Sequence, residues 1–88
     1  MESGSKREEV EQEVKSWVKS IKINQDGRVR LRKDGLNFQA MTKKRPKKQV
    51  LDEVKHQIFH KILEKFPAEA DLIETLLEEA FTEKFFST

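Results

Sequence analysis

Residues 28–48 hold nine of the eighteen Lys and Arg residues of this 88-residue chain and only one acid, Asp34. Concentrated positive charge on a small domain is typical of a surface that binds phosphate groups. Arginine suits this role because its planar fork donates two hydrogen bonds to one phosphate. The sequence therefore predicts a nucleic-acid-binding surface in this basic segment. Its candidate contact residues are Arg28, Arg30, Arg32, Lys33, Lys43, Lys44, Arg45, Lys47 and Lys48.

The charge is distributed unevenly along the chain, although the net charge is only +2. Residues 1–24 carry no net charge, residues 25–48 carry +7, and residues 49–88 carry −5. The acidic C-terminal half would repel nucleic acid and orient the basic segment toward it. A solvated strand face with a charged loop is the alternative, but nine basic residues with one acid exceed what solubility requires.

The middle of the basic segment has the two-residue period of a β-strand. Val29 and Leu31 then face the core. The three arginines of residues 28–32 face the opposite side, about 7 Å apart, which roughly matches successive phosphates of a nucleic-acid backbone. On the next strand, Asn37, Gln39 and Met41 share that outer face and could reach base edges.

The partner that fits best is a nucleic-acid duplex, RNA or DNA, contacted through its backbone or shape. A protein that binds single strands normally presents aromatic side chains among its basic residues, on which bases stack. This chain has no Tyr, and Phe38, the aromatic residue of the basic segment, is expected to face inward.

His56 and His60 are four residues apart on a predicted helix, a spacing that can chelate a metal ion. Asp52 is the one acid well placed to join them, and the chain has neither Cys nor a third His. Both histidines fall opposite the apolar stripe, so we interpret them as exposed polar residues and expect no metal. Trp17, at helical spacing from two valines, is interpreted as a core anchor.

Enzymatic activity is not expected. The acids of residues 68–85 form a solvated face without a paired base, and no glycine-rich phosphate loop or Ser-His-Asp pattern is present. Two of the three glycines serve turns. We therefore expect no catalytic residue and no cofactor.

The end of the chain offers an alternative function. Phe85 and Phe86 fall outside the apolar stripe of the last predicted helix and could contact a protein partner or a second copy of the chain. A chain end that folds back on the core is equally compatible with this pattern. The alternative to nucleic-acid binding is thus a protein-interaction or dimerisation module that uses the acidic C-terminal helix and these two phenylalanines.

Three helices and three short strands are predicted to position these residues. The first helix covers residues 6–20, with Ser5 and Glu8 at the spacing of a capping box. Its apolar residues recur at steps of three and four, which places them on one stripe. They are Val10, Val14, Trp17, Val18 and Ile21.

Two Asp-Gly pairs predict tight turns. The pair at 26–27 separates the alternating residues 21–23 from 28–32, and the pair at 34–35 separates 28–32 from 36–41. The pattern predicts a three-stranded antiparallel meander. A helix over residues 36–44 is an alternative, because Gln, Ala and Met favour helix.

Residues 42–48 form a basic loop, and Pro46 suits the first turn of a second helix over residues 47–65. Pro67 ends that helix, and a third helix over residues 68–85 forms an antiparallel hairpin with it. The predicted fold is a single small α+β domain, α-β-β-β-α-α, with the meander packed on the helices. It covers residues 6–88 and follows a disordered N-terminus or tag remnant.

The composition suits one small intracellular domain, with 35% apolar and 39% charged residues and no Cys. The absence of Cys excludes a disulfide framework and a thiolate metal site. No stretch approaches the roughly 18 apolar residues of a membrane span, and no signal peptide is evident. We therefore expect no membrane association and a cytoplasmic or nuclear location.

The order helix, three short antiparallel strands, basic loop and helix resembles that of double-stranded-RNA-binding domains. In that family a lysine-rich helix start contacts phosphates, and Lys43, Lys44, Lys47 and Lys48 occupy the corresponding place. The resemblance is one of layout, since the strands are shorter and the family's residue signature is absent. A sheet laid in a groove, as in some plant factors and integrase arms, would use the arginines of residues 28–32 instead.

Overall fold

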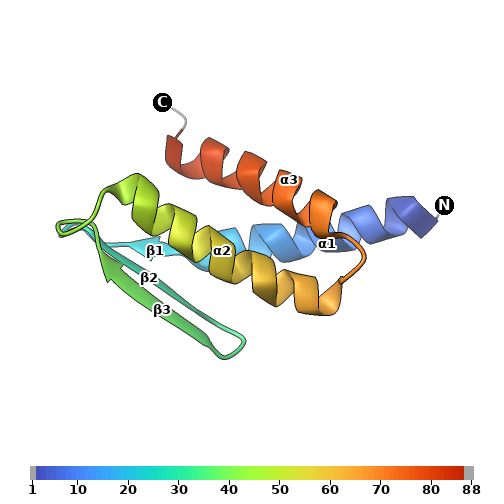
Figure 1. Ribbon diagram of the computed structural model, residues 1–88, viewed down its shortest axis with the longest axis horizontal. Helices are drawn as coiled ribbons and strands as arrows, with labels where there is room; N and C mark the ends of the chain where they lie inside the picture. Colours follow the sequence, from blue (N-terminus) through green and yellow to red (C-terminus); the bar gives the residue numbers. More distant parts are fainter. Residues whose placement is uncertain (1, 87–88) are drawn as a thin grey trace.

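The computed structural model describes the backbone of residues 2–86 and the side chains of residues 6–86. The elements are α1 (Glu2–Ser20), β1 (Lys22–Ile23), β2 (Arg28–Lys33), β3 (Leu36–Met41), α2 (Lys47–Lys65), α3 (Ala70–Phe81) and a π-helical turn (Thr82–Phe86). This order, with an antiparallel sheet between the helices, confirms the predicted α+β fold (Figure 1).

The first helix presents one apolar stripe to the core, as its periodicity predicts, and all five stripe residues are buried. The helix begins at Glu2, four residues before the predicted start. Ser5 therefore lies within the helix and not at its N-terminus, where a capping box must be. Met1 and the side chains of residues 2–5 lie outside the described part, so a disordered start or tag remnant there stays a prediction.

The three strands form an antiparallel sheet in the order β1-β2-β3. Val29 pairs with Ala40 and Leu31 with Phe38, which makes one face of the sheet apolar. α1 and α2 cover this face. Residues 36–41 are a strand, so the helical alternative for residues 36–44 is wrong. Ile23, on the two-residue edge strand β1, is 39% exposed.

Both Asp-Gly pairs occur in turns whose backbone has positive φ angles, which glycine adopts readily. Asp34 (φ 48°) and Gly35 (φ 84°) form the two-residue loop between Lys33 and Leu36, which pair with each other. Two consecutive positive φ angles are the signature of a type I′ turn, whose twist matches that of the flanking strands. Gly27 (φ 90°) lies at the end of the turn between β1 and β2.

Two prolines set the limits of α2. Pro46 (φ −56°) directly precedes the helix, and its carbonyl accepts a hydrogen bond from the N–H of Val50 at 3.1 Å. At the other end Phe66 leaves the helical conformation (φ −131°, ψ 67°), because a residue that precedes proline is disfavoured in the α region. α3 then begins at Ala70 and runs antiparallel to α2 (Figure 1).

The three helices and the inner face of the sheet enclose one hydrophobic core (Figure 1). Trp17 is 1% exposed, which confirms its interpretation as a core anchor. No polar or charged residue is buried in the described part of the chain. None of the helices, over the residues described, is long and apolar enough to cross a membrane.

Candidate nucleic-acid interface

The outer face of the sheet carries the arginines of β2. Arg30 pairs with Gln39 and Arg32 with Asn37 across the β2–β3 ladder, and all four residues are exposed. Lys22 of β1 pairs with Arg30 from the other side. Directly opposed residues project from the same face of a sheet, so the outer face holds cations beside side-chain amides.

A shallow hollow at the β1 edge gathers three of these cations. It has a volume of about 260 Å³ and is lined by Ser20, Lys22, Asn24, Arg30 and Arg32. No carboxylate is among the lining residues. Charges of one sign around a concave surface focus the electrostatic field and raise the local concentration of the opposite ion. A phosphate group would be attracted to this position.

Lys22 is a further candidate for contact with nucleic acid that was not predicted from the sequence, because it lies outside the basic segment. The predicted turn at residues 24–27 could have identified it. A hairpin closed by that turn pairs residue 22 with residue 30 and so places both side chains on one face.

Arg28 joins the outer face to the basic loop. It is half-buried, and its Nε is covered with no hydrogen-bond acceptor among the described residues. Thr42 directly follows β3, and its N–H and its hydroxyl each donate a hydrogen bond to the carbonyl of Gly27 at 2.9 Å. These bonds hold the start of the loop beside Arg28. The loop therefore begins at one end of the arginine row.

Exposed lysines continue from the loop into the start of α2. Lys43, Lys44, Lys47 and Lys48 are exposed, and none forms an ion pair within the described part of the chain. The first turn of α2 contains no acid, and Pro46 supplies no side-chain cap. Unpaired N–H groups at a helix N-terminus favour negative charge. This region therefore adds positive charge to the end of the sheet.

Two of the nine predicted contact residues are held by acids. The guanidinium of Arg45 forms an ion pair with Glu53 of α2. Lys33 lies on the inner side of the sheet, where its Nζ is 3.2 Å from Asp34 Oδ2 and 4.9 Å from the centre of the Trp17 ring. Lys33 therefore stands apart from the arginines of the outer face, and the charge of Arg45 is partly balanced.

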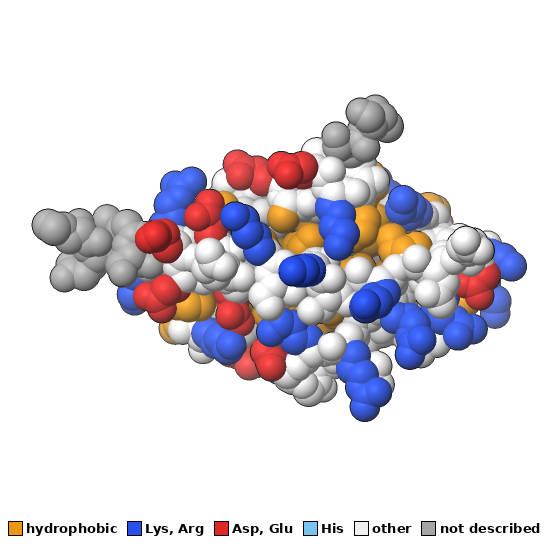
Figure 2. Space-filling model, turned by 180° about the vertical axis from the view of Figure 1, so that it is seen from behind, with side chains coloured by type: hydrophobic (Ala, Val, Ile, Leu, Met, Phe, Trp, Pro, Cys, Tyr) orange, Lys and Arg blue, Asp and Glu red, His pale blue; other side chains and the backbone are white. Residues whose placement is uncertain are grey.

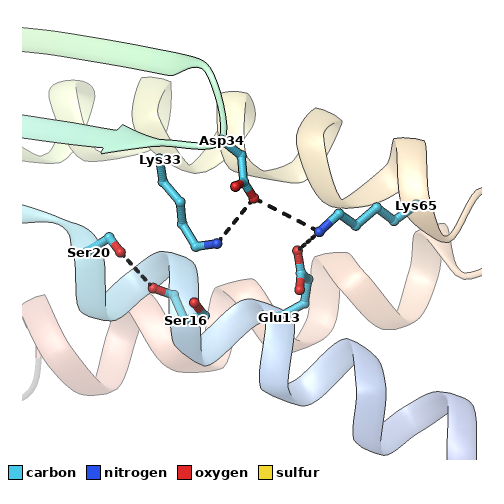
Figure 3. A network of polar contacts seen from close by, with 6 residues as sticks. All are labelled: Glu13, Ser16, Ser20, Lys33, Asp34 and Lys65. Carbon is cyan, nitrogen blue, oxygen red and sulfur yellow. Dashed lines mark hydrogen bonds and ion pairs between the residues drawn. The ribbon is translucent and has the colours of Figure 1, made fainter.

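A network around Asp34 anchors the β2–β3 turn to the helices (Figure 3). Lys65, at the end of α2, donates a hydrogen bond to Glu13 of α1 at 2.8 Å and lies 3.9 Å from Asp34 Oδ2. The hydrogen bond and the charge of Glu13 raise the pKa of Lys65, so this lysine is charged at neutral pH. The turn at the far end of the arginine row is thereby fixed to α1 and α2.

Positive and negative side chains are unevenly distributed on the face of the molecule seen in Figure 2. Seen from behind, Lys and Arg predominate over the half of the molecule that holds the sheet (Figure 2). Acidic side chains gather toward the N-terminal part of α1 and along α3. On this face, the excess of positive charge over the sheet agrees with the concentration of Lys and Arg in residues 28–48.

The two C-terminal phenylalanines have different surroundings. Phe85 packs against the core, with its ring centre 5.3 Å from that of Phe81, whereas Phe86 is 43% exposed. A hollow of about 410 Å³ lies between α1 and α3 and reaches the same π-helical turn. Its apolar lining comes from Val14, Val18, Leu76 and Ala80.

Comparison with known proteins found no match among protein-family models, curated proteins or solved structures. The resemblance to double-stranded-RNA-binding domains stays one of element order. The charge and geometry of the surface are therefore the features that indicate a function.

Proposed function

We propose that this protein is a non-enzymatic nucleic-acid-binding domain that contacts the phosphate backbone through the outer face of the sheet and the basic loop. The observation that carries the proposal is the group of three cations, Lys22, Arg30 and Arg32, around one hollow. Phosphates recur along a nucleic acid at a regular spacing, and the arginines recur along β2 at about 7 Å.

Seven exposed cations without an acidic partner among the described residues form what we call the basic surface. The sheet and the loop each contribute to it, and the hydrogen bonds of Thr42 keep the two parts adjacent. A phosphate backbone that follows the arginine row toward residue 28 would next meet the loop. The members are Lys22, Arg30, Arg32, Lys43, Lys44, Lys47 and Lys48.

A duplex is favoured over a single strand, because the basic surface has no aromatic side chain on which bases could stack. Phe38 lies on the inner face of the sheet and packs against the core. Asn37 and Gln39 stand beside the arginines, so contacts to base edges could accompany contacts to the backbone. A cytoplasmic or nuclear location is part of the proposal, since nucleic acids are found there.

Titration of the protein into labelled duplex DNA, duplex RNA and single strands, at low and at moderate salt, tests the proposal by fluorescence anisotropy. We expect micromolar or tighter binding to a duplex, with a steep loss of affinity as salt rises. Absence of binding to all of them at low salt, where a basic surface attracts polyanions most strongly, would refute the proposal.

A second candidate function is favoured by the position of Phe86. This exposed ring lies in the turn that borders the hollow between α1 and α3, which is lined by four apolar and six charged residues. We propose as the alternative that this end of the acidic helix contacts a second copy of the chain. Its mass in solution would then approach twice 10.4 kDa at high concentration, and Phe86→Ala would restore the monomer. A constant monomer mass would reject this alternative.

A further inference from the structure

Two exposed histidines of α2 bring their ring nitrogens together. His56 and His60 are four residues apart, which places them about 40° from each other around the helix. Their Nε2 atoms are 3.1 Å apart, and the two rings are nearly perpendicular with centres 4.4 Å apart. Both residues are exposed, as predicted, but the expectation of no metal did not take this contact between nitrogens into account, and the proposal below departs from it.

We propose that His56 and His60 form a chelating site for one divalent transition-metal ion of the copper, nickel and zinc class. Imidazole nitrogens bind such ions at about 2.0–2.1 Å. Two nitrogens at that distance are about 2.9 Å apart for a right angle at the metal and about 3.3 Å apart for a tetrahedral angle. The observed separation lies between these values, so small rotations of the exposed rings fit either geometry.

Metal binding requires the proton between the two Nε2 atoms to move to another ring nitrogen. Without metal, the 3.1 Å separation fits a hydrogen bond in which one ring carries its proton on Nε2 and the other accepts it. Metal binding requires a lone pair on both Nε2 atoms, so the donating ring takes the tautomer that carries its proton on Nδ1. Both rings stay neutral and no redox partner is needed.

Water occupies the remaining coordination positions in this proposal. No third His, Cys, Asp or Glu completes a metal-binding group among the described residues. Asp52 and Glu74 line the same hollow as His56. Asp52 lies 4.0 Å from Lys55 Nζ, so Glu74 is the lining acid whose charge most favours a cation there. Lys55 also lines the hollow, but its Nζ is 3.0 Å from Glu78 Oε1. The site is open, unlike the closed four-ligand sites of structural zinc.

Isothermal titration of the whole chain with Cu²⁺, Ni²⁺ or Zn²⁺ at neutral pH tests the proposal, with Mg²⁺ as the control. We expect one ion bound per chain, with Cu²⁺ the tightest, because imidazole sites follow that order. Mg²⁺ should not bind, since it prefers oxygen ligands. Absence of transition-metal binding would overturn the proposal.

A matched variant separates chelation from binding to single histidines. His60→Ala combined with Lys61→His keeps two histidines but moves the second from about 40° to about 140° around the helix. We expect affinity to fall about tenfold or more, because the second nitrogen no longer binds within the same complex. Equal affinity in this variant would overturn the proposal. In the natural chain, Zn²⁺ should shift the nitrogen resonances of both rings, and a shift of only one would also count against it.

Discussion

The combined variant Arg30→Gln, Arg32→Gln, Lys44→Gln tests the basic surface most directly. For B-form DNA, each phosphate contact contributes about 0.9 to the slope of log affinity against log salt. If all seven cations of the basic surface meet phosphates, the slope is about −6, and loss of three contacts leaves about −4. Between 50 and 200 mM salt, the affinity of the natural chain would then fall by nearly four orders of magnitude, against about two for the variant.

The control for this variant removes the same charge from another place. It combines Lys6→Gln, Arg7→Gln and Lys15→Gln, at three exposed positions of α1. Screening at moderate salt acts over about 8–10 Å, so distant charges contribute little to the slope. We expect the control to keep the natural slope in an anisotropy titration. Thermal unfolding should be nearly unchanged in both variants, because exposed substitutions alter stability by only about 0.5 kcal/mol.

Two outcomes would refute the reasoning. If both variants changed the slope equally, net charge and not the basic surface would determine binding. If the sheet variant kept the natural slope, the phosphate contacts would lie elsewhere. Arg45→Gln gives a finer comparison within the same sequence segment. It should reduce the steepness of the salt dependence by less than Lys44→Gln does, because Arg45 is already paired with Glu53.

Stability measurements check the turns and the ion-pair network. Gly27→Ala should lower the free energy of unfolding more than Gly35→Ala, since both positions have positive φ but only the added Cβ at Gly27 would meet Thr42 Oγ1, at 2.5 Å. For Gly35→Ala, we expect the free energy of unfolding to fall by about 1–2 kcal/mol from backbone strain alone. For Gly27→Ala, we expect a further loss of about 1 kcal/mol from the disturbed hydrogen bonds. Equal losses for the two variants in urea unfolding would contradict this. Glu13→Gln should cost a few tenths of a kcal/mol at neutral pH, because its partner Lys65 is largely exposed. The pKa of Lys65 is raised above 10.5 in the folded protein, so this difference should be present at neutral pH and disappear as pH rises through the raised value. A difference that grew in alkaline solution would show that the pair is not its cause.

The fold could be predicted from the spacing of apolar residues, because burial of one face imposes a period of about 3.6 residues on a helix and of two on a strand. The switch from steps of three and four to steps of two separated α1 from the sheet, and the Asp-Gly pairs marked both turns. The ends of two helices were harder to predict, because neither carries a strong helix breaker such as the Pro67 that follows α2. α1 begins before Ser5, and α3 gives way to a π-helical turn at Thr82.

The candidate site was less predictable than the fold, because a position along the chain does not determine a partner in space. Lys33 continues the basic run of β2, yet the same alternation turns it inward toward Trp17. Arg45 lies among unpaired lysines, and its partner Glu53 is eight residues away on the following helix. Charge density alone predicts neither pairing: the strand period places Lys33 inward beside Asp34, whereas the Arg45–Glu53 pair depends on how the loop meets α2.

The same distinction between paired and unpaired cations defines which residues we propose to contact nucleic acid. Lys33 and Arg45, within the segment, form ion pairs with acids, and Lys22 lies beside the arginines from outside it. What remains is a row of unpaired cations that runs from the hollow on the sheet to the start of α2. A polyanion responds to unpaired charge at the surface, because paired charge has already lost much of its field to a nearby partner. The order in which substitutions weaken binding should therefore follow pairing in the structure and not clustering in the sequence.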